Sequence, residues 1–497
     1  MFTASLVGFI TVPVALKYFK TEQYGVWTVI SSVLVYLAVS NLGVNSAASV
    51  LMAKSSGYKE KLIILLRSLK IVAAFVLLVL ASFIALNLYS RDWIFILGRI
   101  PPVLVRQTYL TGFILGVFYL VNLPFSLISA ALNGFQKVYI DNVFSAVLAV
   151  VNFTALLLTI FTGGGLVRFA LFTGGLTLGF NLVKLAVLYF FVLRRAEARS
   201  AAAEAGATGS EELSYGSIIR TGFRFLLLGI AAMIVWNTDN FLISRILGVS
   251  AVVPYSITFK LFYIMFSSIF IINNSSLSLM GQEYGRQNWE WINKIYSKLL
   301  TVTVIIGGLA WLVGLFFLKD VIHLWVGDEG YAGLAVVFFL GAYSYIFGVV
   351  NLNSGLINAF NYTKNMPLVG WLEAGLKFGF TLLCLKLWGI AGAAVGTFTG
   401  CLLSNTWILP IVLHRRSGGR IKTGQDFVLR HLVLILLPLV CAGLLTQLYA
   451  GSAPLRLACG VAGVAVYSYF SYKLAPQDVR DYVKELVLKF KSRYARS

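Results

Sequence analysis

Long apolar segments separated by short polar connections dominate the chain. Most segments hold about 20 residues with few charges, the length that a helix needs to cross the hydrocarbon core of a bilayer. The pattern predicts an all-α polytopic membrane protein with about fourteen transmembrane helices. We expect these helices near residues 2–19, 25–45, 64–88, 108–132, 138–161, 167–192, 217–246, 251–280, 298–318, 333–359, 366–387, 389–412, 430–449 and 454–473.

The composition agrees with a lipid environment. Hydrophobic residues make up 59% of the chain and charged residues only 12%, against about 25% in typical soluble proteins. The net charge of +21 would suggest a nucleic-acid partner in a soluble protein. In a membrane protein we expect no nucleic acid, because basic residues beside the spans contact anionic membrane lipids instead.

A polar connector divides the chain into two halves. Residues 194–216 are rich in charge, alanine, glycine and serine and predict a solvated cytoplasmic linker between lobes 1–193 and 217–416. Short pairs recur across the two halves at an offset of about 229 residues, as expected of an internal repeat. They include Leu127-Ile128 with Leu356-Ile357 and Asn45-Ser46 with Asn274-Ser275.

Each half holds six predicted helices, an even number, so both halves enter the membrane from the same side. This predicts two parallel six-helix repeats. Residues 430–474 add helices 13 and 14, and residues 475–497 predict an amphipathic cytoplasmic tail on the lipid headgroups. Connections on one side of the membrane, with the tail, hold most of the Lys and Arg outside the spans, so both termini are expected in the cytoplasm.

Motifs of soluble enzymes are missing from the sequence. It contains no P-loop, no H-E-x-x-H and no G-x-S-x-G, so we assign no catalytic residue. The four cysteines lie within apolar runs without a C-x-x-C pair, so the sequence indicates neither a disulfide scaffold nor a zinc site. We expect a protein that is not an enzyme and that uses no metal or organic cofactor.

Basic residues inside the predicted spans are the strongest candidates for function. A charge at the centre of a span costs about 2.5 to 3.5 kcal/mol, so it faces a cavity or a partner by default. Lys260 and Lys377 lie deepest, while Lys184 and Arg224 lie nearer cytoplasmic ends and could snorkel to the interface. Glu373 lies one helical turn before Lys377 and could neutralise it. Lys260 has no acidic residue one turn away.

Embedded acidic and amide residues form a second group. Asp239 and Glu373 could bind a coupling ion, H⁺ or Na⁺, or could serve as salt-bridge partners of nearby basic residues. Asn45, Asn274 and Asn353 could bind hydroxyl-rich cargo, or could form hydrogen bonds between helices. The sequence leaves both alternatives open for each group.

Two stretches of the chain carry a family resemblance. The first runs from Thr11-Val12-Pro13 through Glu22-Gln23-Tyr24-Gly25-Val26-Trp27 to Asn41-Leu42-Gly43-Val44. The second is Asn237-Thr238-Asp239-Asn240-Phe241-Leu242-Ile243, followed by Leu247-Gly248 and Tyr255. Both resemble the polysaccharide transporter family, which includes O-antigen flippases and belongs to the multidrug/oligosaccharidyl-lipid/polysaccharide (MOP) exporter superfamily.

This resemblance implies a flippase of the bacterial inner membrane. Its substrate would be an undecaprenyl-diphosphate-linked oligosaccharide, moved by alternating access through a cationic cavity. The resemblance also implies a polysaccharide polymerase and chain-length machinery as partners. A diphosphate needs cationic groups in a low-dielectric site, and the sugar needs polar walls. Under this hypothesis the diphosphate is held by Lys260, Arg224, Lys377 and Lys184, and the sugar by Asn45, Asn274 and Asn353.

Two other classes of protein stay open at this point. A cation-coupled multidrug exporter of the same superfamily would suit acidic residues in the cavity, although embedded basic residues are in excess here. A membrane-embedded polysaccharide polymerase or glycosyltransferase usually carries a sizeable outer loop with catalytic acids. The longest outer connection here, near 89–107, contains a single acidic residue, Asp92.

Overall fold

The computed structural model describes residues 2–55, 57–90, 92–194, 214–362, 366–449, 452–481 and 484–485. All regular elements within these ranges are helices. A membrane-spanning backbone has no water to hydrogen-bond with, so it must pair its polar groups internally, and a helix does this within one segment. Thirteen of the helices are long and apolar enough to cross a membrane, which confirms the expected all-α polytopic fold.

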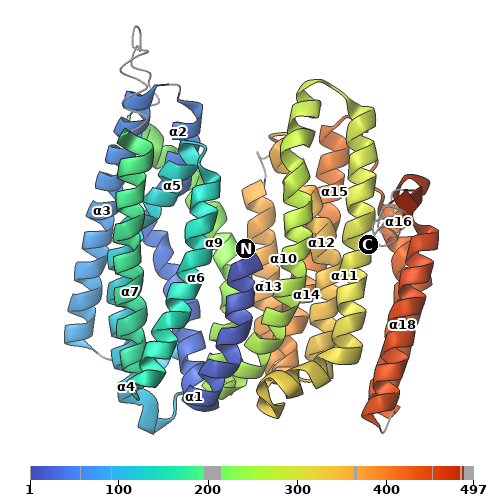
Figure 1. Cartoon of the computed structure of the whole chain (residues 1–497), viewed down its shortest axis with the longest axis horizontal. Helices are drawn as coiled ribbons and strands as arrows, with labels where there is room; N and C mark the ends of the chain where they lie inside the picture. Colours follow the sequence, from blue (N-terminus) through green and yellow to red (C-terminus); the bar gives the residue numbers. More distant parts are fainter. Residues whose placement is uncertain are drawn as a thin grey trace, which may run out of the picture. The chain divides into compact units, whose positions relative to one another are not determined.

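The helices follow one another with short connections (Figure 1). The α-helices are α1 (Phe2–Leu34), α2 (Val44–Lys54), α3 (Tyr58–Tyr89), α4 (Val105–Asn122), α5 (Ser126–Gly134), α6 (Val138–Phe161), α7 (Leu166–Val187), α9 (Tyr215–Leu247), α10 (Val249–Gly285), α11 (Trp289–Val326), α12 (Leu334–Ala359), α13 (Met366–Trp388), α14 (Ala391–Leu403), α15 (Asn405–Arg416), α16 (Gln425–His431), α17 (Leu437–Tyr449) and α18 (Ala453–Leu474). The turns η1 (Val35–Asn41), η4 (Leu123–Phe125), η5 (Leu188–Leu193) and η9 (Leu432–Leu436) extend neighbouring helices.

The first two predicted helices are joined within α1. The backbone leaves the helical conformation at Lys20, where φ is 59°, so α1 consists of two helical segments (Figure 1). The second segment continues through η1, and the pair forms a single candidate span, Leu6–Asn41. This connection explains why the described residues contain thirteen such spans where the sequence predicts about fourteen.

The chain folds into two compact units, Met1–Val253 and Pro254–Ser497. The sequence repeat places the start of the second lobe at residue 217, before α9. In the structure, α9 packs against α1 and α2 and belongs to unit 1. The repeat boundary expected from the sequence and the packing boundary therefore lie on opposite sides of α9.

Close backbone contacts hold α9 inside unit 1. A methyl group on Gly43, at the start of α2, would lie 2.1 Å from the carbonyl oxygen of Gly222 in α9. At the other end of α9, a methyl group on Gly98 would lie 2.3 Å from the carbonyl oxygen of Ser244. Only glycine permits these two approaches, since both Gly43 and Gly98 also have positive φ angles.

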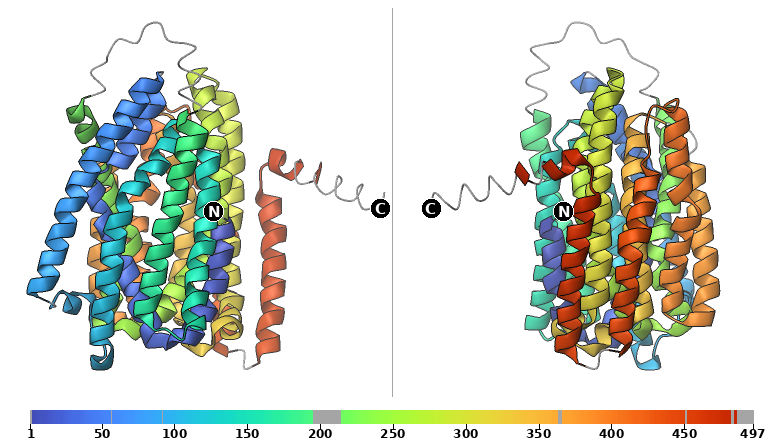
Figure 2. Two further views of the ribbon diagram at one scale, coloured as in Figure 1. Left: turned by 60° about the vertical axis from the view of Figure 1, so that its left-hand side comes forward. Right: turned by 90° about the vertical axis from the view of Figure 1, so that its right-hand side faces the viewer.

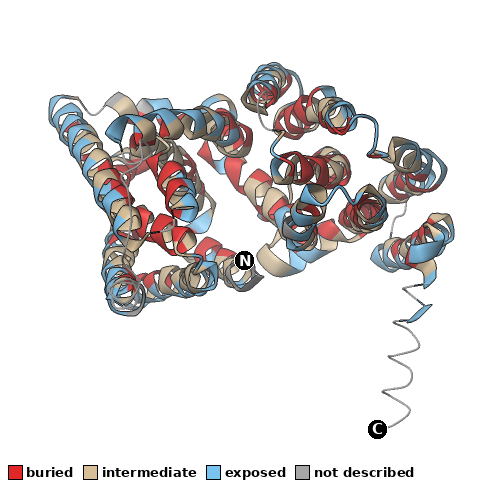
Figure 3. Cartoon of the chain, turned by 90° about the horizontal axis from the view of Figure 1, so that it is seen from above, coloured by how far each residue is buried: buried red, intermediate tan, exposed pale blue. Residues whose placement is uncertain are grey.

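In unit 2, α11 packs on α12, α17 and α18 and supplies many of the buried side chains. The glycines Gly392, Gly396 and Gly400 of α14 face α13 so closely that a methyl group on any of them would meet backbone atoms of α13. These three glycines therefore form a helix-packing face. In the view of Figure 3, exposed positions recur along the helices of both units, and exposed large apolar side chains are common, as expected where helices face lipid.

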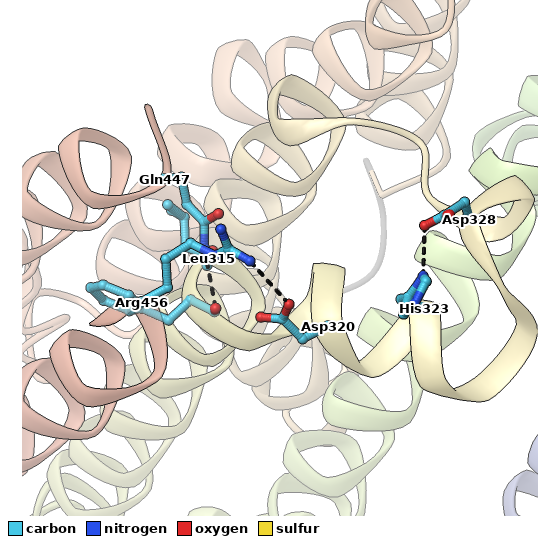
Figure 4. Close-up of polar contacts among 7 residues, drawn as sticks. Leu315, Asp320, His323, Asp328, Gln447 and Arg456 are labelled. Carbon is cyan, nitrogen blue, oxygen red and sulfur yellow. Dashed lines mark hydrogen bonds and ion pairs between the residues drawn. The ribbon is translucent and has the colours of Figure 1, made fainter. Parts of the chain in front are cut away.

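Polar contacts attach the two C-terminal helices to unit 2. Arg456 of α18 lies 3.3 Å from Asp320 of α11, and the Gln447 amide of α17 donates to the carbonyl oxygen of Leu315 at 2.9 Å (Figure 4). Buried His431 of α16 lies 3.0 Å from the Ser471 hydroxyl of α18. Figure 2 shows α18 standing at the edge of this unit. The cytoplasmic linker expected at 194–216 and the tail expected at 475–497 fall largely outside the described residues.

Candidate functional site

Lys184 forms an ion pair in unit 1. Its Nζ lies 2.7 Å from Asp141 Oδ1 and donates to the Ser129 hydroxyl at 2.7 Å, while that hydroxyl donates to Asp141 Oδ1 at 2.8 Å. The ammonium also lies 5.7 Å from the centre of the Phe144 ring. Side chains of α5 and α6 thus bond to the ammonium group that α7 carries. The pair has little net charge to offer a diphosphate, which favours a structural role for Lys184.

Arg224 lies on the exposed face of α9. Arg220, one turn earlier, is exposed on the same helix. Neither guanidinium forms an ion pair with the described residues. The two side chains therefore supply uncompensated positive charge at the start of α9.

Lys260 lies on α10, three helical turns from its start, and is half-buried. No hydrogen bond or ion pair joins it to any residue in the described ranges of the chain. The sequence had indicated this isolation through the lack of an acidic residue one turn away. Lys260 is thus an embedded cation whose charge is not compensated within the described structure, so it retains full capacity to bind an anion.

Lys377 and Glu373 occupy neighbouring turns of α13, and their charges interact. The amide of Asn405 and the thiol of Cys401 bond to Glu373 from α15 and α14. Lys377 is 3% exposed, and Gly400 packs directly on its backbone. This arrangement favours the alternative in which Glu373 neutralises Lys377. The Glu373 carboxylate could also accept a proton, the alternative role that the sequence left open for it.

Asp239 lies buried in unit 1, within a polar cluster between α1, η1 and α9. The Tyr36 hydroxyl lies 2.6 Å from the Thr238 hydroxyl, and the Asn240 amide donates to the Ser32 hydroxyl at 2.9 Å. Asp239 is 5% exposed and close enough to act electrostatically on Tyr36. Tyr36 and Ser32 had not been identified from the sequence, because about 200 residues separate them from their partners.

The three predicted sugar-binding amides have different surroundings. The Asn45 amide donates to the Ser126 hydroxyl in unit 1, and Asn274 is exposed on α10. Asn353 is fully buried beside the Tyr296 hydroxyl, at 2.9 Å. Tyr296 also lies 3.0 Å from the carbonyl oxygen of Thr423, and a hydroxyl has one proton. The Tyr296 hydroxyl can therefore donate to Asn353 Oδ1 or to the Thr423 carbonyl oxygen, and the contact with Asn353 joins two helices, which favours a structural role.

Unit 2 also contains an open cavity of about 370 Å³ between α10 and α12. Its lining residues are Leu277, Gly281, Gly355, Asn358 and Ala359. Beyond it, the end of the unit carries stacked aromatic rings and arginines. The sequence pattern does not reveal this cavity, because the cavity depends on how two helices pack.

Known proteins match this chain in sequence over part of its length. Residues 225–365 match the model of the MatE family. A Bacillus subtilis (strain 168) protein named "Probable multidrug resistance protein YoeA" is 34% identical over 82 residues, which cover 16% of this chain and 18% of that protein. A Salmonella typhimurium protein named "Putative O-antigen transporter" is 24% identical over 203 residues, 40% of this chain and 46% of that protein. The chain thus matches less than half the length of either relative.

Solved structures match over a much larger part of the chain. One is an inward-facing multidrug resistance MATE family transporter of the MOP superfamily, with a TM-score of 0.69, 14% identity, and coverage of 84% of this chain and 95% of that one. Another is the lipid II flippase MurJ in an inward closed conformation, with a TM-score of 0.67, 14% identity, and coverage of 95% and 97%. Together with the MatE match, these similarities show that the chain has the fold of the MOP-superfamily transporters.

Proposed function

We propose that this protein is a flippase that moves a lipid-linked oligosaccharide across the bacterial inner membrane by alternating access. The substrate class is an undecaprenyl-diphosphate-linked glycan such as an O-antigen repeat unit. The fold supports transport, and the Salmonella relative is named as an O-antigen transporter. The observation that favours an anionic, membrane-anchored substrate is the charge of Lys260, which no described residue compensates.

The physical argument starts from the cost of an embedded charge. Holding an ammonium within a span is unfavourable, and Lys184 and Lys377 offset that cost with Asp141 and Glu373. Lys260 has no such carboxylate among the described residues. A diphosphate that enters from the bilayer surface would supply the missing negative charge, and its polyprenyl chain would stay in lipid.

The test compares substitutions of Lys260 in full-length protein reconstituted into liposomes with an undecaprenyl-diphosphate-linked glycan. An impermeant glycan-modifying reagent reports how fast the lipid reaches the outer leaflet. We expect Lys260→Gln to slow flipping at least about tenfold and Lys260→Arg to retain most of it, because a charged hydrogen bond contributes about 1.5 to 3 kcal/mol. Lys386→Gln, at an exposed position in the same unit, is the matched control. Unchanged flipping by Lys260→Gln would remove the basis of the proposal.

A cation-coupled multidrug exporter is the second candidate. The relative from Bacillus subtilis is named as a multidrug resistance protein, and two carboxyl groups, buried Asp239 and half-buried Glu373, are candidates to bind a coupling ion. Efflux of cationic drugs from a sensitised strain distinguishes the two candidates. Under the flippase proposal, expression of this protein gives no drug resistance, and deletion of its gene strands a lipid-linked glycan on the cytoplasmic leaflet.

The polymerase alternative gains no support from the matched proteins, which are named as transporters, a flippase and a resistance protein. A polysaccharide polymerase and chain-length machinery remain proposed partners of the flippase. They would use the glycan after it has crossed the membrane.

A further inference from the structure

One end of unit 2 gathers aromatic rings that come from three helices and their connections. The Tyr284 ring of α10 stacks on Phe360 at a centroid distance of 4.5 Å and contacts Tyr362 edge-on at 5.8 Å. Trp289, at the start of α11, contacts Tyr284 edge-on at 5.5 Å. The Tyr362 hydroxyl donates to the Tyr284 hydroxyl at 3.2 Å. We call these four rings the aromatic platform. Phe360 is buried, so the half-buried rings of Tyr284, Trp289 and Tyr362 form its accessible face.

Two arginines flank the aromatic platform. The Arg420 guanidinium lies 5.3 Å from the Trp289 ring and donates to the Gln287 side chain at 3.1 Å. Arg416, at the end of α15, and Arg420 are both exposed, and both act electrostatically on Tyr362. In the described part of the chain, no carboxylate pairs with either arginine. The Glu283 carboxylate lies at the same end of unit 2 and forms an ion pair with the Arg286 guanidinium at 2.7 Å.

The residues that line the cavity of about 370 Å³ are close in sequence to those of the aromatic platform. Its lining residue Gly281 lies one turn before Tyr284 on α10, and its lining residue Ala359 directly precedes Phe360. Asn358 lines the cavity, is exposed, and makes no side-chain hydrogen bond with described residues. The volume lies within the range of small-molecule sites, about 300 to 1,000 Å³.

The chemistry of the three parts fits one kind of ligand. Guanidinium groups bind phosphate oxygens with paired N–H donors. A free amide donates to and accepts from hydroxyl groups, and aromatic rings give a sugar ring an apolar face to pack on. A headgroup with a sugar attached to a phosphate would use all three parts. An ordinary anionic phospholipid headgroup would use the arginines alone.

We propose that the cavity between α10 and α12, with the aromatic platform and Arg416 and Arg420, is a loading subsite for the sugar–phosphate headgroup of a polyprenyl-linked glycan. The proposal rests on the proposed function and names a place where the substrate first binds. Arg416 and Arg420 hold the phosphates, and Asn358 and the platform select the sugar. This subsite is separate from Lys260, which lies about six turns from Gly281 along α10.

The experiment measures equilibrium binding to full-length protein in phosphatidylcholine nanodiscs. The probes are farnesyl-diphosphate-linked N-acetylglucosamine and farnesyl diphosphate without sugar. We expect Arg416→Gln with Arg420→Gln to weaken binding of both probes at least about tenfold. Asn358→Leu should weaken the glycosylated probe about fivefold and leave the sugar-free probe unchanged. Arg286→Gln removes one positive charge that is already paired with Glu283 and should leave both affinities unchanged.

Several outcomes would overturn the proposal. Equal affinity of the double arginine variant and the unmodified protein would remove the phosphate role, and equal losses of both probes in Asn358→Leu would remove the sugar role. Phosphatidylglycerol nanodiscs that block the glycosylated probe as well as they block farnesyl diphosphate would identify a lipid-headgroup site. Asn358→Ala provides a smaller substitution if Asn358→Leu unfolds. Because binding is measured without turnover, the subsite can fail while the liposome flipping assay succeeds, and the reverse.

Discussion

The Nζ atom of Lys184 lies 2.7 Å from Oδ1 of Asp141, with the side chains 10% and 18% exposed. Two helices, α6 and α7, therefore share a nearly buried ion pair, and the Ser129 hydroxyl of α5 bonds to both partners. Removing one partner of such a pair leaves the other charge uncompensated, which costs more than removing both.

We therefore expect Asp141→Asn to destabilise the protein by about 3 kcal/mol, and Asp141→Asn with Lys184→Met to recover most of that loss. Thermal unfolding of full-length protein in detergent measures both. If Lys184 instead bound the substrate, the double variant would be stable but would flip the glycan poorly. That result would restore Lys184 to the diphosphate site and contradict its structural role.

Glu373 and Lys377 allow a similar separation of roles in unit 2. Glu373→Gln keeps a side chain that can accept from Asn405 but leaves Lys377 without its negative neighbour. We expect lower stability in this variant and recovery when Lys377→Met is added, with flipping retained in the double variant. Transport assays with and without a proton or sodium gradient supply the control. Loss of gradient dependence in the double variant would show that Glu373 binds the coupling ion.

The contact between α2 and α9 can be tested with a matched pair of glycines. Gly43 has φ +68° and a methyl group there would lie 2.1 Å from a carbonyl oxygen, whereas Gly163 has φ +60° and open space around it. Alanine at Gly163 should cost about 1 kcal/mol for its backbone conformation alone. Alanine at Gly43 should cost about 1 to 3 kcal/mol more, because α9 must move away. Equal unfolding temperatures for the two variants would mean that this packing is not required.

Tyr331, between α11 and α12, gives a pH-dependent prediction. Burial, with the negative charge of Asp320 nearby, raises its pKa to about 12. Because the folded state binds the phenolic proton more tightly than the unfolded state, this contribution to stability is present below about pH 10 and is lost between about pH 10 and about pH 12. The absorbance titration of the unmodified protein minus that of Tyr331→Phe isolates this group. A midpoint near pH 10 would contradict the assigned environment.

The sequence alone predicted the helical membrane fold, most helix positions and the isolation of Lys260. These features depend on hydropathy and on spacing within one helix, and both are local properties of the chain. The bilayer requires long apolar helices whatever their neighbours are. Residues three or four positions apart share a face of a helix, so the sequence also determines which residues lie one turn away on the same helix.

Tertiary structure decided which embedded charges are neutralised and where the cavity and the aromatic platform lie. Asp141 and Lys184 lie 43 residues apart on different helices, and the aromatic platform joins residues from Tyr284 to Tyr362. Coulomb interactions and ring contacts act over a few ångströms between helices, so they depend on the rotation and crossing of each helix pair. The pattern of apolar residues along one helix leaves that geometry undetermined, and packing against neighbouring helices sets it.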